Sequence, residues 1–165
     1  MTIPSSGPEL SNLFRKLGAR NAEAWARSQV TEGIPQLHRF LFLRACWRMV
    51  VGDDEVGWID HHIAAAKDDP GGVFAGMGAA LDRAVAAGVS KEDLSQIARG
   101  MQVELLLGLC YMLEDNGLEE PELQGMGWGL FQTSDDGAAL APIQGLHESV
   151  LETDPTGREM RPGSA

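Results

Sequence analysis

The stretch that decides the fold is SKEDLSQIARGMQVELLLGLCYMLEDNG, residues 90–117. Ser90 can serve as the N-cap of a helix, with Asp93 completing a variant of the capping box. Gly117 is placed to end that helix in a left-handed conformation. Apolar residues recur at helical spacing along one side and, from Met101 onward, along the opposite side as well. A helix that is apolar all round is a buried helix, so we expect the other helices to surround this one.

The rest of the chain shows helical patterns before this stretch and a β pattern after it. Apolar spacing bounded by Gly, Pro and Asn signals predicts helices near residues 8–18, 21–33, 34–51, 53–67 and 70–88. The segments WGLFQT and AALAPI, separated by SDDG, predict a β-hairpin at about 128–143. The expected fold is therefore mainly α: an irregular helical bundle around a buried central helix (90–117), with a small C-terminal hairpin.

Length and composition indicate a globular domain. A chain of 165 residues with 44% hydrophobic and 22% charged residues can bury a core without disulfide or metal staples. We expect residues 1–153 to form one helical domain with the hairpin, and residues 154–165 to form a flexible tail. Cys46 and Cys110 stand alone in apolar patterns, which predicts buried reduced thiols. We find neither a secretory signal nor a membrane-spanning run, and we expect a cytoplasmic protein without membrane contact.

The net charge of −11 is unevenly distributed. Residues 1–50 hold seven Lys/Arg and three Asp/Glu, a balance of +4, whereas residues 51–165 hold six and twenty-one, a balance of −15. Phosphate contacts need a positive surface, so direct nucleic-acid binding is not expected. The acidity instead favours a basic protein partner.

Glu104 is the polar residue that fits its surroundings least. Its neighbours on the predicted central helix are apolar, and an unpaired buried carboxylate would cost several kcal/mol. Arg44 and Arg48, which share a face of another apolar helix, are the natural cations. We favour a buried ion pair that sets helix register over a polar pocket that binds a small anion or supplies an acid/base group. These three residues are the weak candidates for a catalytic site.

The histidines form no recognised metal motif. His61 and His62 are adjacent, so on a helix they point about 100° apart. Neither H-E-x-x-H nor the helical Glu-x-x-His pattern occurs. Asp60, His61 and His62 are weak candidates for metal ligands, and we favour a surface or helix-end role for them. A nucleophile elbow and a phosphate-binding loop are also absent from the sequence. We therefore expect no cofactor.

Two functions remain open. The first is a non-enzymatic cytosolic protein-binding domain of inhibitor, immunity, adaptor or chaperone type, which engages a basic protein. Its binding residues would be an acidic cluster with one aromatic anchor: Glu114, Asp115, Glu119, Glu120, Glu122 and Trp128. The second is a small-molecule or metal-dependent enzyme that uses Glu104 with Arg44 and Arg48, or the acidic and histidine-containing segment 53–62. An apolar patch around Trp128 could equally be a homodimer seam. We favour the first function because no catalytic motif is found.

Overall fold

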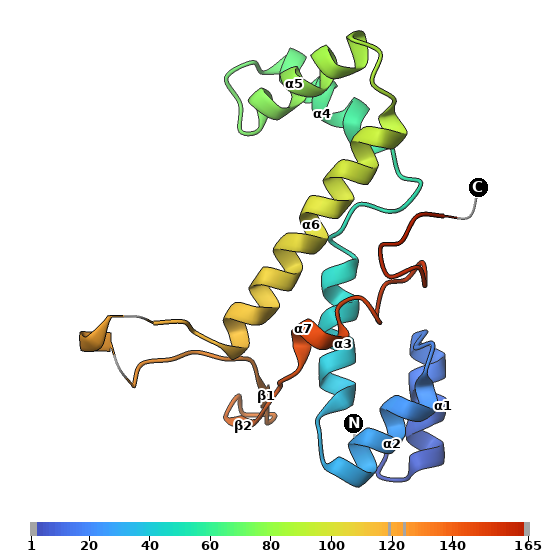
Figure 1. Cartoon of the computed structure of the whole chain (residues 1–165), viewed down its shortest axis with the longest axis vertical. Helices are drawn as coiled ribbons and strands as arrows, with labels where there is room; N and C mark the ends of the chain where they lie inside the picture. Colours follow the sequence, from blue (N-terminus) through green and yellow to red (C-terminus); the bar gives the residue numbers. More distant parts are fainter. Residues whose placement is uncertain (1–2, 119, 124, 164–165) are drawn as a thin grey trace. The chain divides into compact units, whose positions relative to one another are not determined.

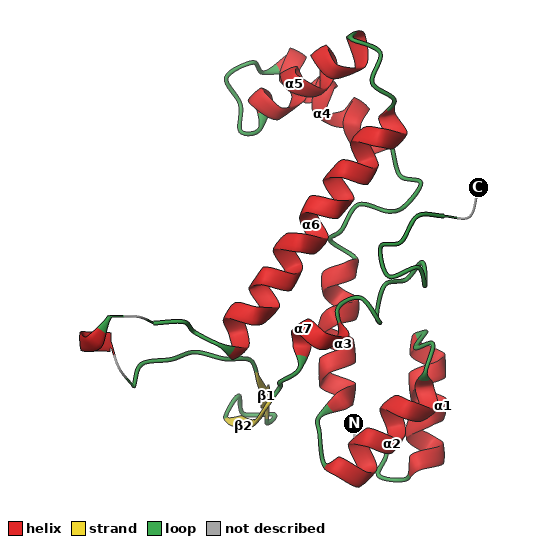
Figure 2. Ribbon diagram, viewed as in Figure 1, coloured by secondary structure: helices red, strands yellow, loops and turns green. Residues whose placement is uncertain are grey.

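The computed structural model describes residues 3–118, 120–123 and 125–163, and this part of the chain is mainly helical (Figure 2). The helices are α1 (Gly7–Leu17), α2 (Ala22–Glu32), α3 (Gln36–Trp47), α4 (Gly57–Asp68), α5 (Ala75–Ala86), α6 (Lys91–Glu114) and α7 (Leu146–Ser149). A short 3-10 helix, η1 (Pro121–Leu123), follows α6, and strands β1 (Phe131–Thr133) and β2 (Ala139–Pro142) form an antiparallel hairpin. The predicted class, mainly α with a small C-terminal hairpin, is confirmed.

The chain divides into two compact units, whereas the sequence led us to expect one domain over residues 1–153. The first unit comprises residues 1–49 and 105–165, and the second comprises residues 50–104. The division falls within α6, so the N-terminal part of this helix belongs to the second unit and its C-terminal part to the first.

The core of the first unit is built from aromatic rings on three consecutive helices. α1 packs against α2, and α2 packs against α3 (Figure 1). The ring of Phe14 lies 5.9 Å from that of Trp25 and 5.7 Å from that of Phe40, and the latter two are 5.6 Å apart. Two of these three contacts are edge-to-face, a geometry that aromatic pairs prefer. Helical spacing alone places Leu10 beside Phe14, and both are fully buried.

The segment that follows α7 is held against these helices by hydrogen bonds. The indole N–H of Trp47 donates to the carbonyl of Val150 at 2.9 Å. The guanidinium group of Arg20 donates to the carbonyls of Glu152, at 2.5 Å, and Gly157, at 2.7 Å. Part of the predicted tail, 154–165, therefore makes specific contacts with the first unit, while its mobility stays a prediction.

The second unit is organised by a close approach between α4 and α5, which lie side by side in Figure 1. A Cβ atom on Gly78 would lie 2.1 Å from the carbonyl oxygen of His62 and 2.6 Å from the Cβ atom of Ala66. Only glycine fits at this crossing. The N-terminal part of α6 joins this unit through Ser95, whose hydroxyl accepts a hydrogen bond from the indole of Trp58 at 2.9 Å.

Helix α6 begins and ends close to the predicted positions. The backbone N–H of Asp93 donates to the hydroxyl of Ser90 at 3.0 Å, as expected of an N-cap. The helix ends at Glu114, shortly before Gly117, which adopts a positive φ of 58°.

The sides of α6 differ in burial, although both are apolar. One side is covered and carries Val103, Leu106 and Cys110, all at most 8% exposed. The opposite side lies open, and its apolar residues are 43% to 66% exposed: Ile97, Met101, Leu105, Leu109 and Met112. The prediction that residues 90–117 form a helix buried on every side is therefore wrong.

The hairpin buries only part of its apolar set. Phe131 pairs with Pro142, and Thr133 with Ala139. Ile143 is buried, whereas Phe131 and Leu140 are exposed. In the part of the chain that the structure describes, no helix combines the length and apolar character that crossing a membrane requires.

Candidate functional site

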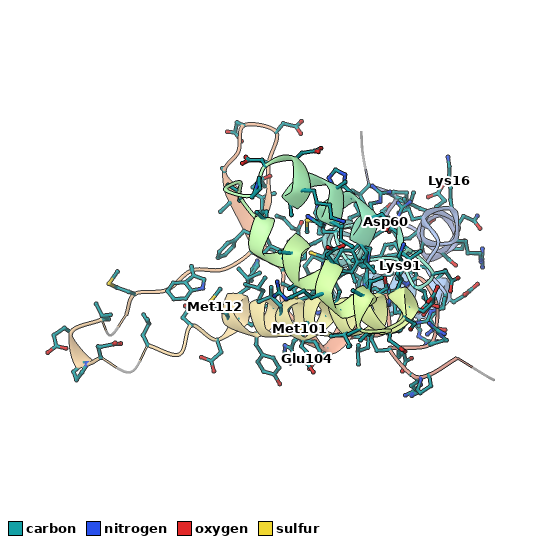
Figure 3. All side chains as sticks on the ribbon, turned by 90° about the horizontal axis from the view of Figure 1, so that it is seen from above. Lys16, Asp60, Lys91, Met101, Glu104 and Met112 are labelled. Carbon is teal, nitrogen blue, oxygen red and sulfur yellow. The ribbon has the colours of Figure 1, made fainter. Side chains whose placement is uncertain are left out.

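Glu104 lies on the open side of α6, between Met101 and Met112 along the helix (Figure 3). Its side chain is exposed. A carboxylate in water needs no buried cation. The expected buried ion pair of Glu104 with Arg44 or Arg48 is therefore wrong, and a polar pocket built on Glu104 is excluded with it.

Arg44 lies in the last turn of α3, and Arg48 is its C-cap residue with helical backbone angles, so the two share one side, as their spacing predicts. Both line a cavity of the first unit that also contains Arg20. The aromatic side chains of Trp25, Phe40 and Trp47 line the same cavity. This combination could not be recognised from the sequence, because the residues come from separate helices.

The three weak metal candidates, Asp60, His61 and His62, do not converge on one point. Both carboxylate oxygens of Asp60 accept hydrogen bonds from Lys91, at 2.6 and 2.7 Å (Figure 3). The rings of His61 and His62 are 5.5 Å apart and tilted by 70°. Among the described residues, no group of three or more His, Cys, Asp or Glu side chains could hold a metal ion.

Glu114 is turned inward and is not part of the exposed acidic set. One of its carboxylate oxygens accepts a hydrogen bond from the backbone N–H of Leu146, the first residue of α7. The other lies 3.3 Å from Nδ1 of His147, whose ring stacks on Tyr111 at 4.1 Å. Glu114 therefore attaches α7 to the end of α6, and the structure gives no support to its predicted role in partner binding.

The other members of the predicted acidic cluster are exposed where they are described. Asp115 follows the last turn of α6, and Glu120 and Glu122 lie in the segment between α6 and the hairpin. Glu119 lies outside the described residues.

Trp128 is attached to the C-terminal end of α6. Its indole N–H donates to the carbonyl of Met112 at 2.9 Å. The side chain of Asn116 accepts a hydrogen bond from the backbone N–H of Trp128 at 3.0 Å and donates to its carbonyl at 3.1 Å. Trp128 nevertheless remains 48% exposed, so its ring is held in place but is not covered.

We call this set of exposed residues of the first unit the Met112–Trp128 face. It consists of the exposed apolar residues of the C-terminal part of α6, the attached tryptophan and the exposed carboxylates: Leu105, Leu109, Met112, Trp128, Asp115, Glu120 and Glu122. The sequence pointed to the tryptophan and the carboxylates, but it missed the share of α6 because we expected that helix to be covered. The signal that could have shown it is Glu104, a charge within the apolar stripe.

No protein-family model, curated protein or solved structure matches the chain.

Cys110 is buried on the covered side of α6, and Cys46 is likewise buried and unpaired, as predicted. Burial raises the pKa of the Cys110 thiol to about 12 from an ordinary value of 9.0, and Cys46 and Glu114 nearby add to the rise. Between these two pKa values the folded chain holds a proton that the unfolded chain releases. The contribution to stability is therefore complete below about pH 9 and is lost as the pH rises toward 12.

We expect the free energy of unfolding to fall with rising pH in this window, by up to about 1.4 kcal/mol per pH unit more than in Cys110→Ala. Urea denaturation of both proteins at several values between neutral and alkaline pH measures the two slopes. Comparison of slopes removes the constant cost of the cavity that the substitution leaves. Equal slopes in the two proteins would contradict the prediction.

Proposed function

We propose that the chain is a non-enzymatic protein-binding domain, of inhibitor, immunity, adaptor or chaperone type, whose Met112–Trp128 face binds a basic protein partner. The observation that carries this proposal is the exposure of apolar side chains at helical spacing, together with exposed carboxylates in the segment that follows. Leu105, Leu109 and Met112 follow the i, i+4, i+7 spacing of one helix face. Exposed contiguous apolar surface rimmed by polar groups is typical of interaction sites.

A basic amphipathic helix is the kind of partner segment that suits this face. Its apolar residues would pack against α6, and its Lys and Arg residues would approach Asp115, Glu120 and Glu122. Trp128 supplies an aromatic anchor whose position is already set by the hydrogen bonds to Met112 and Asn116. Such preorganisation lowers the entropy cost of binding.

The charge of the chain supports the same partner chemistry. The net charge of −11, with a balance of −15 over residues 51–165, attracts a basic protein over the screening length of the solvent. We place the domain in the cytoplasm, a location that its two free buried thiols support.

Met112→Lys is expected to reduce capture of the partner at least tenfold, because the new charge is buried at the interface and repels basic residues. The test is a pull-down from native lysate with the immobilised protein at low salt, followed by the same pull-down at high salt. Met49→Lys is the matched control, since Met49 is 74% exposed in the first unit but lies outside the Met112–Trp128 face. The free energy of unfolding of both variants is expected to lie within about 0.5 kcal/mol of that of the parent.

Two outcomes would contradict the proposal. The first is a pull-down in which Met112→Lys and Met49→Lys reduce the amount of captured partner equally, or in which high salt leaves that amount unchanged. The other is a concentration-dependent doubling of mass that Met112→Lys abolishes, which would show that the face joins two copies of this chain instead. Size-exclusion chromatography with light scattering measures the mass.

A further inference from the structure

The first unit contains a cavity of about 290 Å³ whose lining combines arginines with aromatic rings. Its lining includes three arginines, three aromatic residues and two carboxylates: Arg20, Arg44, Arg48, Trp25, Phe40, Trp47, Glu152 and Asp154. The cavity uses none of the residues of the Met112–Trp128 face.

Helical spacing on α3 brings four of these side chains to one side. Phe40, Arg44, Trp47 and Arg48 follow the i, i+4, i+7, i+8 pattern of a single helix face. The aromatic walls are held by the fold: Phe40 packs against Trp25 at 5.6 Å, and the indole N–H of Trp47 is bound by the carbonyl of Val150. The cavity is therefore shaped before any ligand arrives.

The guanidinium groups differ in their partners. That of Arg20 is bound by the backbone carbonyls of Glu152 and Gly157. Those of Arg44 and Arg48 make no hydrogen bond or ion pair with any side chain or backbone group in the described part of the chain. Two unpaired guanidinium groups one turn apart are unexpected in a chain with a net charge of −11.

Two carboxylates, those of Glu152 and Asp154, also line the cavity, and each has a hydrogen-bond partner of its own. Glu152 accepts a hydrogen bond from the side chain of Asn21 at 3.1 Å. Asp154 is almost fully buried, and its carboxylate accepts hydrogen bonds from the backbone N–H of Thr156, at 3.0 Å, and from its hydroxyl, at 2.7 Å. Three arginines against these two carboxylates leave the lining with a charge of +1.

We propose that this cavity binds a small organic anion, a molecule with one carboxylate or phosphate group and a flat apolar part. The fork of a guanidinium group matches both kinds of oxyanion, and Arg44 and Arg48 would hold the anionic group between them. The flat part packs against the rings of Trp25, Phe40 and Trp47. Small-molecule sites usually start at about 300 Å³, so a cavity of about 290 Å³ suits a ligand at the small end of this range.

Isothermal titration calorimetry of the whole chain at low salt tests the site with four probes. Phenyl phosphate and benzoate carry the two candidate anionic groups on the same ring, and the tighter of them identifies the preferred group. Inorganic phosphate lacks the ring and benzylamine reverses the charge. We expect saturable binding of one ring-bearing anion per chain, binding of inorganic phosphate at least tenfold weaker than that of phenyl phosphate, and no binding of benzylamine. If neither phenyl phosphate nor benzoate binds, or if benzylamine binds equally well, the proposal is overturned.

Variants of the arginines locate the binding. Arg44→Met and Arg48→Met are each expected to weaken binding of the preferred probe at least tenfold. Arg83→Met removes an exposed arginine of the second unit, and its affinity for the preferred probe is expected to stay within twofold of that of the parent. Arg48 is itself exposed, so its replacement keeps the proposal testable if Arg44→Met does not fold. Binding that Arg48→Met leaves unchanged, or that Arg83→Met weakens equally, would place the anion elsewhere.

Discussion

Replacing Phe14 by alanine is expected to lower the free energy of unfolding of the first unit by about 3–5 kcal/mol. The Phe14 side chain has no exposed surface, and its ring contacts those of Trp25 and Phe40. The substitution removes apolar surface from the core and leaves a cavity among rings that their own contacts hold in place. Urea denaturation followed by tryptophan fluorescence measures the change, since Trp25 lies beside the site.

Phe74→Ala provides the matched control for this prediction. Phe74 is 69% exposed, so the same chemical change there is expected to alter stability by no more than about 0.5 kcal/mol. Its positive φ of 66° is equally unfavourable for phenylalanine and alanine and cancels from the comparison. Similar losses at the two positions would mean that the aromatic cluster is not the core of the first unit.

Gly78→Ala is expected to destabilise the second unit by about 3 kcal/mol, at the upper end of the range for overpacking. The new Cβ would lie 2.1 Å from the carbonyl oxygen of His62, a backbone atom that cannot rotate away. α4 and α5 must therefore move apart. The loss is measured as a lower midpoint of urea denaturation, followed by circular dichroism.

Gly76→Ala, on the same helix, is expected to change the free energy of unfolding in the opposite direction. A Cβ on Gly76 would meet no atom within 4 Å. Alanine is favoured over glycine inside a helix by up to about 1 kcal/mol, so this variant should be slightly more stable than the parent. Destabilisation of equal size at both positions would rule out a close approach centred on Gly78.

Three glycines in the predicted helix 70–88 show what the sequence can indicate by itself. Glycine weakens a helix by up to about 1 kcal/mol, so Gly72, Gly76 and Gly78 indicate sites of close approach between helices. The structure confirms this at Gly78 alone, because the neighbour that a Cβ would strike belongs to α4. The same region shows a boundary error: we expected the helix to begin near Pro70, but it begins at Ala75, after Phe74 in a left-handed conformation.

For the candidate sites too, the sequence predicted some features correctly and missed others. Arg44 and Arg48 were recognised as sharing a helix face, and the aromatic walls that complete their cavity come from packing between α2 and α3. Glu104 was assigned to a buried pair because its neighbours in the sequence are apolar. Those neighbours include the exposed Met101 and Leu105, so local hydrophobicity misreported the environment of the carboxylate.

By itself, the sequence determined the helices, the N-cap at Ser90, the hairpin and the residues that share each helix face. These features follow from backbone hydrogen bonding and side-chain periodicity, which act over a few residues. Only the tertiary structure decided which apolar side of α6 is covered, that Glu114 faces α7, and that unpaired arginines meet aromatic rings. Burial depends on segments far apart in the chain, and two apolar sides of one helix look alike until a neighbour packs against one of them.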